Sequence, residues 1–245
     1  MTTADLLFLV LIAVLLLLDH FALWPTFLRR SEVDPGRARR WLWLAWMIML
    51  WTLTAAGIGV WLFETRAWDS LRFTRPSGWR LWVATVLVLA FAIHYARTVI
   101  TIAKRKRPKR VRMGHTHAEK LAPHTRSELA WWLALSVSAG FCEEFIFRGY
   151  LIWVFQPMFG LWGAAALSVV AFAAAHAYQG VKSALATGIV GCVLMAVVLI
   201  FGSLWPAIAL HALVDIGQGL VAWLVLRKIP DEGEVLPDLA SQPGS

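Results

Sequence analysis

Charged residues are scarce in this sequence of 245 residues: Asp, Glu, Lys and Arg make up 16%, whereas 59% of the residues are hydrophobic. Soluble domains carry about 25% charged and about 45–50% apolar residues. Several apolar runs here exceed the ~18 residues that mark a membrane-crossing helix. The shortage of charge therefore excludes an ordinary water-soluble domain and predicts an all-α polytopic membrane helix bundle with about seven transmembrane helices.

Cysteine is rarer still, with only Cys142 and Cys192, both inside apolar runs. Their separation fits neither a disulfide framework nor a metal or redox motif, so both are expected as free thiols. The N-terminus also lacks the basic segment and small-residue cleavage site of a signal peptide. We therefore expect its apolar run to persist as an uncleaved first span.

Seven apolar runs predict the membrane helices. Their expected bounds are residues 4–28, 41–63, 79–103, 129–155, 161–177, 183–201 and 204–226.

These runs divide the chain into four parts. Residues 1–103 form an N-terminal three-helix membrane region, and residues 104–128 form a basic cytoplasmic loop. Residues 129–228 form a helical core. The tail, residues 229–245, is rich in Pro, Gly and acidic residues, which predicts disorder.

The net charge of +8 comes mostly from the connections between apolar runs. Lys and Arg number five in residues 29–40, four in residues 64–80 and nine in residues 104–128. Because cytoplasmic loops are enriched in Lys and Arg, we expect the N-terminus outside and the C-terminus in the cytoplasm. Basic loops of this kind contact anionic lipid headgroups, so the charge indicates membrane lipids and no nucleic acid.

Ionisable residues inside the apolar runs are notable because each costs on the order of 2.5–3.5 kcal/mol at membrane depth. Glu143, Glu144 and Arg148 all lie in the run 129–155. On an α-helix, Glu144 and Arg148 share a face one turn apart and are expected to pair. Glu143 would then remain as a second carboxylate, free for another role.

Three further polar residues lie in later runs. His176 is near the end of the fifth run, and His211 and Asp215 are one helical turn apart in the seventh. This spacing lets the carboxylate orient the imidazole or share a ligand with it. A single histidine on an apolar helix is more often a packing residue, but polar groups on three helices are expected to meet in the bundle interior. Together these residues supply a base, two imidazoles, an arginine and a further carboxylate, which are the groups that hydrolysis requires.

The same residues resemble, in order and on separate helices, the three motifs of the CPBP family of intramembrane proteases: Glu143-Glu144-x-x-x-Arg148, Phe172-x-x-x-His176 and His211-x-x-x-Asp215. This family is related to the type II CAAX prenyl endopeptidase and to bacteriocin-processing and ABI-like immunity proteins. The resemblance covers residues 127–226. It implies an endopeptidase in a bacterial-type cell membrane that cleaves a peptide bond of a membrane-associated or lipidated substrate.

Mapped by motif, the resemblance also implies roles for the first four residues. Glu143 is the general base that activates water, and His176 helps to hold that water. Glu144 pairs with Arg148 and so keeps Glu143 poised.

The resemblance gives His211 and Asp215 the task of stabilising the tetrahedral intermediate or positioning the scissile carbonyl. An ionised Asp215 only accepts hydrogen bonds and would orient His211, whereas a protonated or metal-bound Asp215 would act directly. If a divalent metal such as zinc takes part, Glu143, His176 and His211 are the candidate ligands. The spacing is compatible with a metal-assisted mechanism and with a glutamate mechanism that needs no metal.

Two other function classes use a similar polar core. A non-proteolytic scaffold or immunity protein of the same fold would keep it for partner binding. A proton-coupled transporter would relay protons through buried Glu, His and Asp. That class often shows internal repeats with paired broken helices, and this sequence has no convincing repeat.

Asp19 and His20, near the inner end of the first run, are polar enough to notice, and snorkelling to the membrane interface explains them at least as well as a function does. Tryptophan is frequent, with fifteen copies. Five that lie near span ends are expected at the headgroup level: Trp41, Trp43, Trp46, Trp131 and Trp132.

Overall fold

The computed structural model describes residues 1–104 and 117–226, and all regular structure in this part is helical. Most of the predicted basic loop (residues 105–116) and the predicted disordered tail (residues 229–245) lie outside the described residues.

The helical segments are α1 Thr3–Leu18, η1 Asp19–Leu23, α2 Trp24–Ser31, α3 Pro35–Phe63, η2 Trp68–Leu71, α4 Trp79–Lys104, α5 His117–Leu121, α6 Arg126–Glu143, η3 Glu144–Leu151, α7 Ile152–Ala175, η4 Ala177–Gln179, α8 Val181–Phe201 and α9 Trp205–Leu226. Of these, η1 and η3 are π-helical, and η2 and η4 are 3₁₀ turns.

Six helical stretches within the described residues are long and apolar enough to cross a membrane, and one of them, Arg126–Ala175, has 50 residues. At ~1.5 Å per residue it would extend about 75 Å, far beyond a hydrocarbon core of ~30 Å. It breaks at Gly160, whose φ of 66° favours glycine. The two arms of this stretch are the fourth and fifth predicted spans, so the prediction of a polytopic helical bundle is confirmed. The first arm continues through Pro157, so its predicted end at residue 155 is too early.

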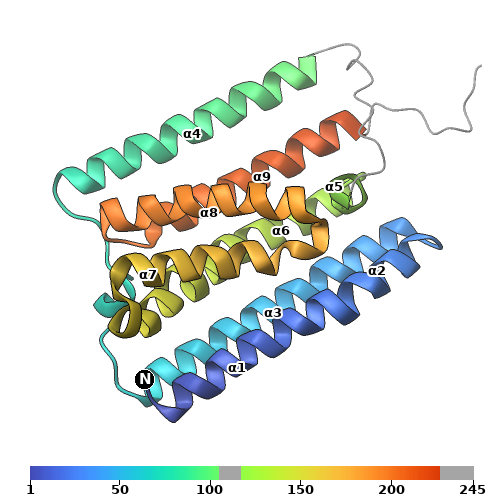
Figure 1. The fold of residues 1–245 in the computed structure, drawn as a ribbon. Helices are drawn as coiled ribbons and strands as arrows, with labels where there is room; N and C mark the ends of the chain where they lie inside the picture. Colours follow the sequence, from blue (N-terminus) through green and yellow to red (C-terminus); the bar gives the residue numbers. More distant parts are fainter. Residues whose placement is uncertain (105–116, 227–245) are drawn as a thin grey trace, which may run out of the picture.

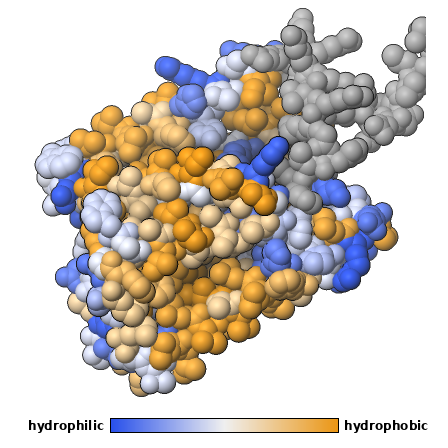
Figure 2. All heavy atoms as spheres, in the orientation of Figure 1, coloured by the Kyte–Doolittle hydropathy of each residue, from blue (hydrophilic) through white to orange (hydrophobic). Residues whose placement is uncertain are grey.

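The long helices lie side by side, and the chain runs back and forth along their common direction (Figure 1). Helix α6 lies at the centre, packed against both α3 and α9. Helix α4 covers α9 from the other side, and α7 pairs with α8. Hydrophobic residues cover much of the visible helix surface, whereas hydrophilic residues gather toward the helix ends (Figure 2). This distribution is expected for helices whose flanks face lipid.

A buried ion pair fastens α3 to α6 near the start of both helices. Arg39 donates to both carboxylate oxygens of Glu128, at 2.9 and 3.2 Å. Glu128 also forms a capping box with Thr125, the residue before α6. The Glu128 carboxylate thus pairs with a buried guanidinium and also accepts from backbone N–H groups that have no partner within the helix at the start of α6.

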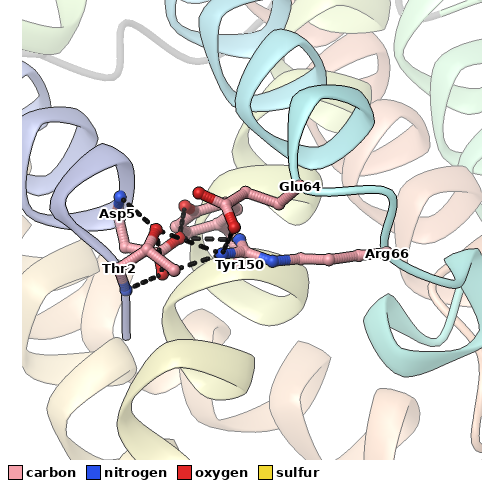
Figure 3. A network of polar contacts seen from close by, with 5 residues as sticks. All are labelled: Thr2, Asp5, Glu64, Arg66 and Tyr150. Carbon is pink, nitrogen blue, oxygen red and sulfur yellow. Dashed lines mark hydrogen bonds and ion pairs between the residues drawn. The ribbon is translucent and has the colours of Figure 1, made fainter.

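A second polar network joins three distant segments at the opposite end of α3 (Figure 3). Arg66, in the connection between α3 and α4, donates to both oxygens of Asp5 in the first turn of α1, at 2.7 and 2.9 Å. The Tyr150 hydroxyl, from η3, donates to the same carboxylate. The guanidinium also lies 4.3 Å from the ring centre of Trp153. This network fixes α1 and the α3–α4 connection against the segment that follows the Glu143-Glu144 pair.

Three residues predicted at the interface are inside the protein instead. Asp19 is 4% exposed, and Trp43 and Trp46 are 0% and 9% exposed. The indole of Trp46 donates to Asp19 Oδ1 at 2.7 Å, so the two residues satisfy each other. These side chains face protein because α1 and α3 pack against each other and against the Tyr178 segment, so snorkelling does not describe Asp19.

We expect Asp5→Asn to lower the unfolding temperature by about 3–10 °C. It removes the charge of the nearer ion-pair partner of Arg66 and leaves Glu64 at 3.7 Å, and hydrogen bonds to charged groups contribute about 1.5–3 kcal/mol. Thermal unfolding of the purified protein in detergent measures the shift. Asp69→Asn, at an exposed position, is the matched control. Equal unfolding temperatures for both variants would contradict the role of the network.

Candidate active site

The predicted polar residues surround one cavity of about 490 Å³. Glu143 comes from the end of α6, His176 follows the last residue of α7, and His211 and Asp215 come from α9; all four line the cavity. The walls between them are largely apolar. The expected convergence of carboxylates and imidazoles from three helices is therefore present in the structure.

Glu144 and Arg148 form the ion pair that their spacing predicts. Arg148 Nη1 donates to Glu144 Oε1 at 2.9 Å, and both side chains are 0% exposed. Arg148 Nη2 donates to the Gly191 carbonyl of α8 at 3.3 Å, and its guanidinium lies 4.0 Å from the ring centre of Phe172 in α7. The pair therefore anchors the segment after α6 to α7 and α8.

The sequence analysis expected this pair on an α-helix. The pair lies instead in the π-helical segment η3, which begins at Glu144. The wider π turn weakens the usual backbone pairing, and Ser168 of α7 compensates by donating to the Phe147 carbonyl at 2.6 Å. π-Helical turns occur frequently at functional sites. Here the change of helix type falls directly between Glu143 and Glu144, so the two adjacent carboxylates point to different surroundings.

His211 is oriented by Glu144. Its Nδ1 lies 2.8 Å from Glu144 Oε1, and because a carboxylate paired with Arg148 accepts hydrogen bonds, Nδ1 carries the hydrogen. The other ring nitrogen, Nε2, then faces Glu143 Oε2 and Asp215 Oδ2, each at 3.7 Å. The spacing let Asp215 either orient this imidazole or share a ligand with it; the shorter contact is with Glu144, which therefore orients the ring.

His176 is fixed by its own helix. Nδ1 lies 2.9 Å from the Phe172 carbonyl, which only accepts, so Nδ1 carries the hydrogen and Nε2 is left for other contacts. The ring stacks on Tyr178, with an interplanar angle of 26°. Burial raises the pKa of the Tyr178 hydroxyl, which therefore remains a neutral neighbour.

A close approach of α6 to α9 sets the distance between Glu143 and His211. A Cβ added at Gly140 would lie 2.9 Å from the backbone nitrogen of Ala212, closer than real Cβ contacts come. Gly140 is one turn before Glu143, and Ala212 follows His211. The missing side chain of Gly140 therefore allows the acidic and imidazole groups to reach each other.

Within the described residues, no group of three or more His, Cys, Asp or Glu side chains could hold a metal ion. The candidate ligands Glu143, His176 and His211 are not among such groups, and metal dependence stays a prediction. Glu143 Oε2 is nevertheless buried without a hydrogen-bond partner among these residues. A buried polar atom of this kind is ready to accept from water or from a bound ligand.

Asp19 is an acidic residue of this cavity that was noticed in the sequence but not assigned to the site. It lines the same cavity as Glu143 and His176, on the wall that η1 and α3 form. Its signal was present in the sequence: a carboxylate sits well inside an apolar run. The expectation of snorkelling concealed it.

Comparison with known proteins agrees with the three motifs. Residues 125–217 match the family described as type II CAAX prenyl endopeptidase Rce1-like. This match confirms the resemblance to the CPBP and CAAX protease family and supports, in general terms, an intramembrane CAAX-type endopeptidase. Searches of curated proteins and of solved structures found no match.

The two adjacent glutamates should respond differently to the same change. Glu144→Gln leaves Arg148 buried without its counter-charge, and breaking such a pair costs about 3–5 kcal/mol, or roughly 6–18 °C in unfolding temperature. Glu143→Gln should change stability little, because Glu143 Oε2 has no hydrogen-bond partner among the described residues. Thermal unfolding of both variants in detergent makes the comparison. A Glu144→Gln protein as stable as wild type would show that the ion pair does not hold η3.

Proposed function

We propose that this chain, whose residues 125–217 carry the type II CAAX endopeptidase pattern, is an intramembrane endopeptidase that hydrolyses a peptide bond with a glutamate-activated water. The observation that carries the proposal is the placement of Glu143, which lines the cavity whereas Glu144 does not. Glu143 Oε2 has no hydrogen-bond partner among the described residues and lies 3.7 Å from His211 Nε2. Its neighbour Glu144 is already engaged with two other groups.

Glu143 is the general base of this mechanism. Its carboxylate removes a proton from a water molecule as the water oxygen attacks the scissile carbonyl carbon. The carboxyl group then gives that proton to the leaving nitrogen as the C–N bond breaks, which returns Glu143 to its starting form. Proton transfers of this type by a positioned side chain contribute typically about 10²–10⁴-fold to the rate.

The two histidines have different tasks because their Nδ1 atoms are held differently. His176 Nε2 has a free lone pair when the ring is neutral, so it accepts a hydrogen bond from the attacking water. His211 has one carboxylate at Nδ1 and two more within 3.7 Å of Nε2. Such surroundings favour the imidazolium, whose Nε2–H then donates to the oxyanion of the tetrahedral intermediate. Donors of this kind are strongest in a site that excludes water.

Asp215 supports His211 in this scheme. As an ionised carboxylate 3.7 Å from Nε2, it favours the positively charged ring without donating to the oxyanion itself. Its role is electrostatic, while Glu144 sets the orientation of the ring.

The substrate is a peptide segment that can enter an apolar cavity within the membrane, from a membrane-associated or lipidated protein. Leu50, Leu53, Ile146 and Val190 are among the apolar side chains that line the walls. They suit a hydrophobic side chain or lipid group next to the scissile bond. A divalent metal such as zinc stays a prediction that a chelator tests.

Glu143→Gln and His176→Ala should each lower the rate of peptide cleavage, Glu143→Gln by about 10²–10⁴-fold. Purified protein in detergent or proteoliposomes, given a library of membrane-associated and prenylated peptides with and without a chelator, measures cleavage and metal dependence together. Glu32→Gln, at an exposed position, is the matched control and should cleave like wild type.

Cleavage by Glu143→Gln at the wild-type rate would contradict the mechanism. A normal biological effect of both variants without any cleavage would favour the scaffold or immunity alternative. Uptake of a solute by proteoliposomes that Glu143→Gln abolishes would favour a transporter.

We also propose that the N-terminus lies outside the cell and the C-terminus in the cytoplasm, because the basic residues gather in the first and third connections. A fluorescent protein fused to the C-terminus should then mature and fluoresce, whereas a periplasmic phosphatase fused there should be inactive. The opposite pattern would reverse the orientation.

A further inference from the structure

Asp19 lies where a functional residue is expected, but the mechanism above gives it no role. It lies in the first membrane span, about 18 Å from the end of that span at Ser31 on a rise of ~1.5 Å per residue. A charged side chain at such depth costs several kcal/mol, and residues of this kind mark functional sites by default. Asp19 also lies outside residues 125–217, the segment that matches the endopeptidase family.

A π-helical turn in the first span accompanies the placement of Asp19 at the cavity wall. Pro25 has no N–H to pair with the Phe21 carbonyl, and its ring would collide with that carbonyl in a regular α-helix. The chain responds with the π-helical segment η1, in which the Trp24 N–H bonds to the Asp19 carbonyl five residues earlier. Asp19 begins η1 just as Glu144 begins η3. Both π-helical segments of the described chain thus begin with a buried carboxylate.

The Asp19 carboxylate is held but its charge is not neutralised by a basic residue of the cavity. Trp46 Nε1 donates to Oδ1 at 2.7 Å, which fixes the side chain with a neutral group. In the described part of the chain, the cavity lining contains no Lys or Arg. His176 lines the same cavity as Asp19, whereas His20, its neighbour in the chain, is exposed.

Tyr178 links the two sides of this arrangement. Its ring lies 5.6 Å from the ring of Trp46 and stacks on His176 at 6.3 Å. The Asp19–Trp46 pair and the His176 ring therefore share one packed wall of the cavity.

We propose that Asp19 is a positioning residue of the active site: its negative charge supports His176 during the attack of water. This inference rests on the proposed endopeptidase function. As water approaches the scissile carbonyl and gives a proton to Glu143, positive charge builds on the imidazole that accepts the other hydrogen bond of the water. Asp19 stabilises that charge and makes His176 Nε2 a stronger acceptor.

The test separates the charge of Asp19 from its hydrogen bond. Asp19→Asn removes the charge but keeps an oxygen that accepts from Trp46, whereas Asp19→Leu removes both. We expect both variants to lower kcat about tenfold, equivalent to about 1.4 kcal/mol of barrier, with little change in KM. Only Asp19→Leu should lower the unfolding temperature. Cleavage assays and thermal unfolding are run beside wild type and Glu143→Gln.

Three results would overturn the inference. If Asp19→Asn has the wild-type kcat, the carboxylate serves only as an acceptor for Trp46. If Asp19→Asn raises KM and leaves kcat unchanged, Asp19 binds substrate and does not support His176. If wild type shows no more cleavage than Glu143→Gln, the proposed endopeptidase function itself fails. The first two results would overturn only the role of Asp19 and would leave that function intact.

Discussion

The site depends on a single carboxylate oxygen, Glu144 Oε1, which accepts from Arg148 at 2.9 Å and lies 2.8 Å from His211 Nδ1. This atom joins the π-helical segment η3 to α9, while Arg148 extends the connection to α7 and α8. Buried charges are tolerated only where they are paired and hydrogen-bonded. The same contact that makes the Glu144–Arg148 pair tolerable in the membrane therefore also orients an imidazole of the cavity.

The division of work between Glu143 and Glu144 follows from that contact. Two adjacent carboxylates repel each other and cannot both be solvated in an apolar bundle. The junction of α6 and η3 turns Glu144 toward Arg148 and His211, and leaves Glu143 at the cavity wall. The close approach at Gly140 then brings Glu143 and His211 within 3.7 Å. One dipeptide thus supplies both a structural glutamate and the glutamate that we propose as general base.

Much of this arrangement was predictable from the sequence, because the apolar runs set the helices and the cost of buried charge requires that polar groups meet. The helical bundle and the Glu144–Arg148 pair followed from such patterns, and the resemblance to the CPBP family followed from the three motifs. Helix type did not, since apolar periodicity does not distinguish an α-turn from a π-turn, and the contact between His211 and Glu144 was not predicted. Asp19 was missed because its burial depends on how α1 packs against α3, which hydropathy does not report.

The most direct test of the account is the ¹⁵N NMR spectrum of histidine-labelled protein, with the His211 signals assigned by substitution. The account predicts that His211 Nδ1 carries a hydrogen in a strong hydrogen bond, and that this signature is lost in Glu144→Gln but kept in Glu143→Gln. An unprotonated Nδ1 in the wild-type protein, or a signature unaffected by Glu144→Gln, would contradict the claim that Glu144 orients the imidazole.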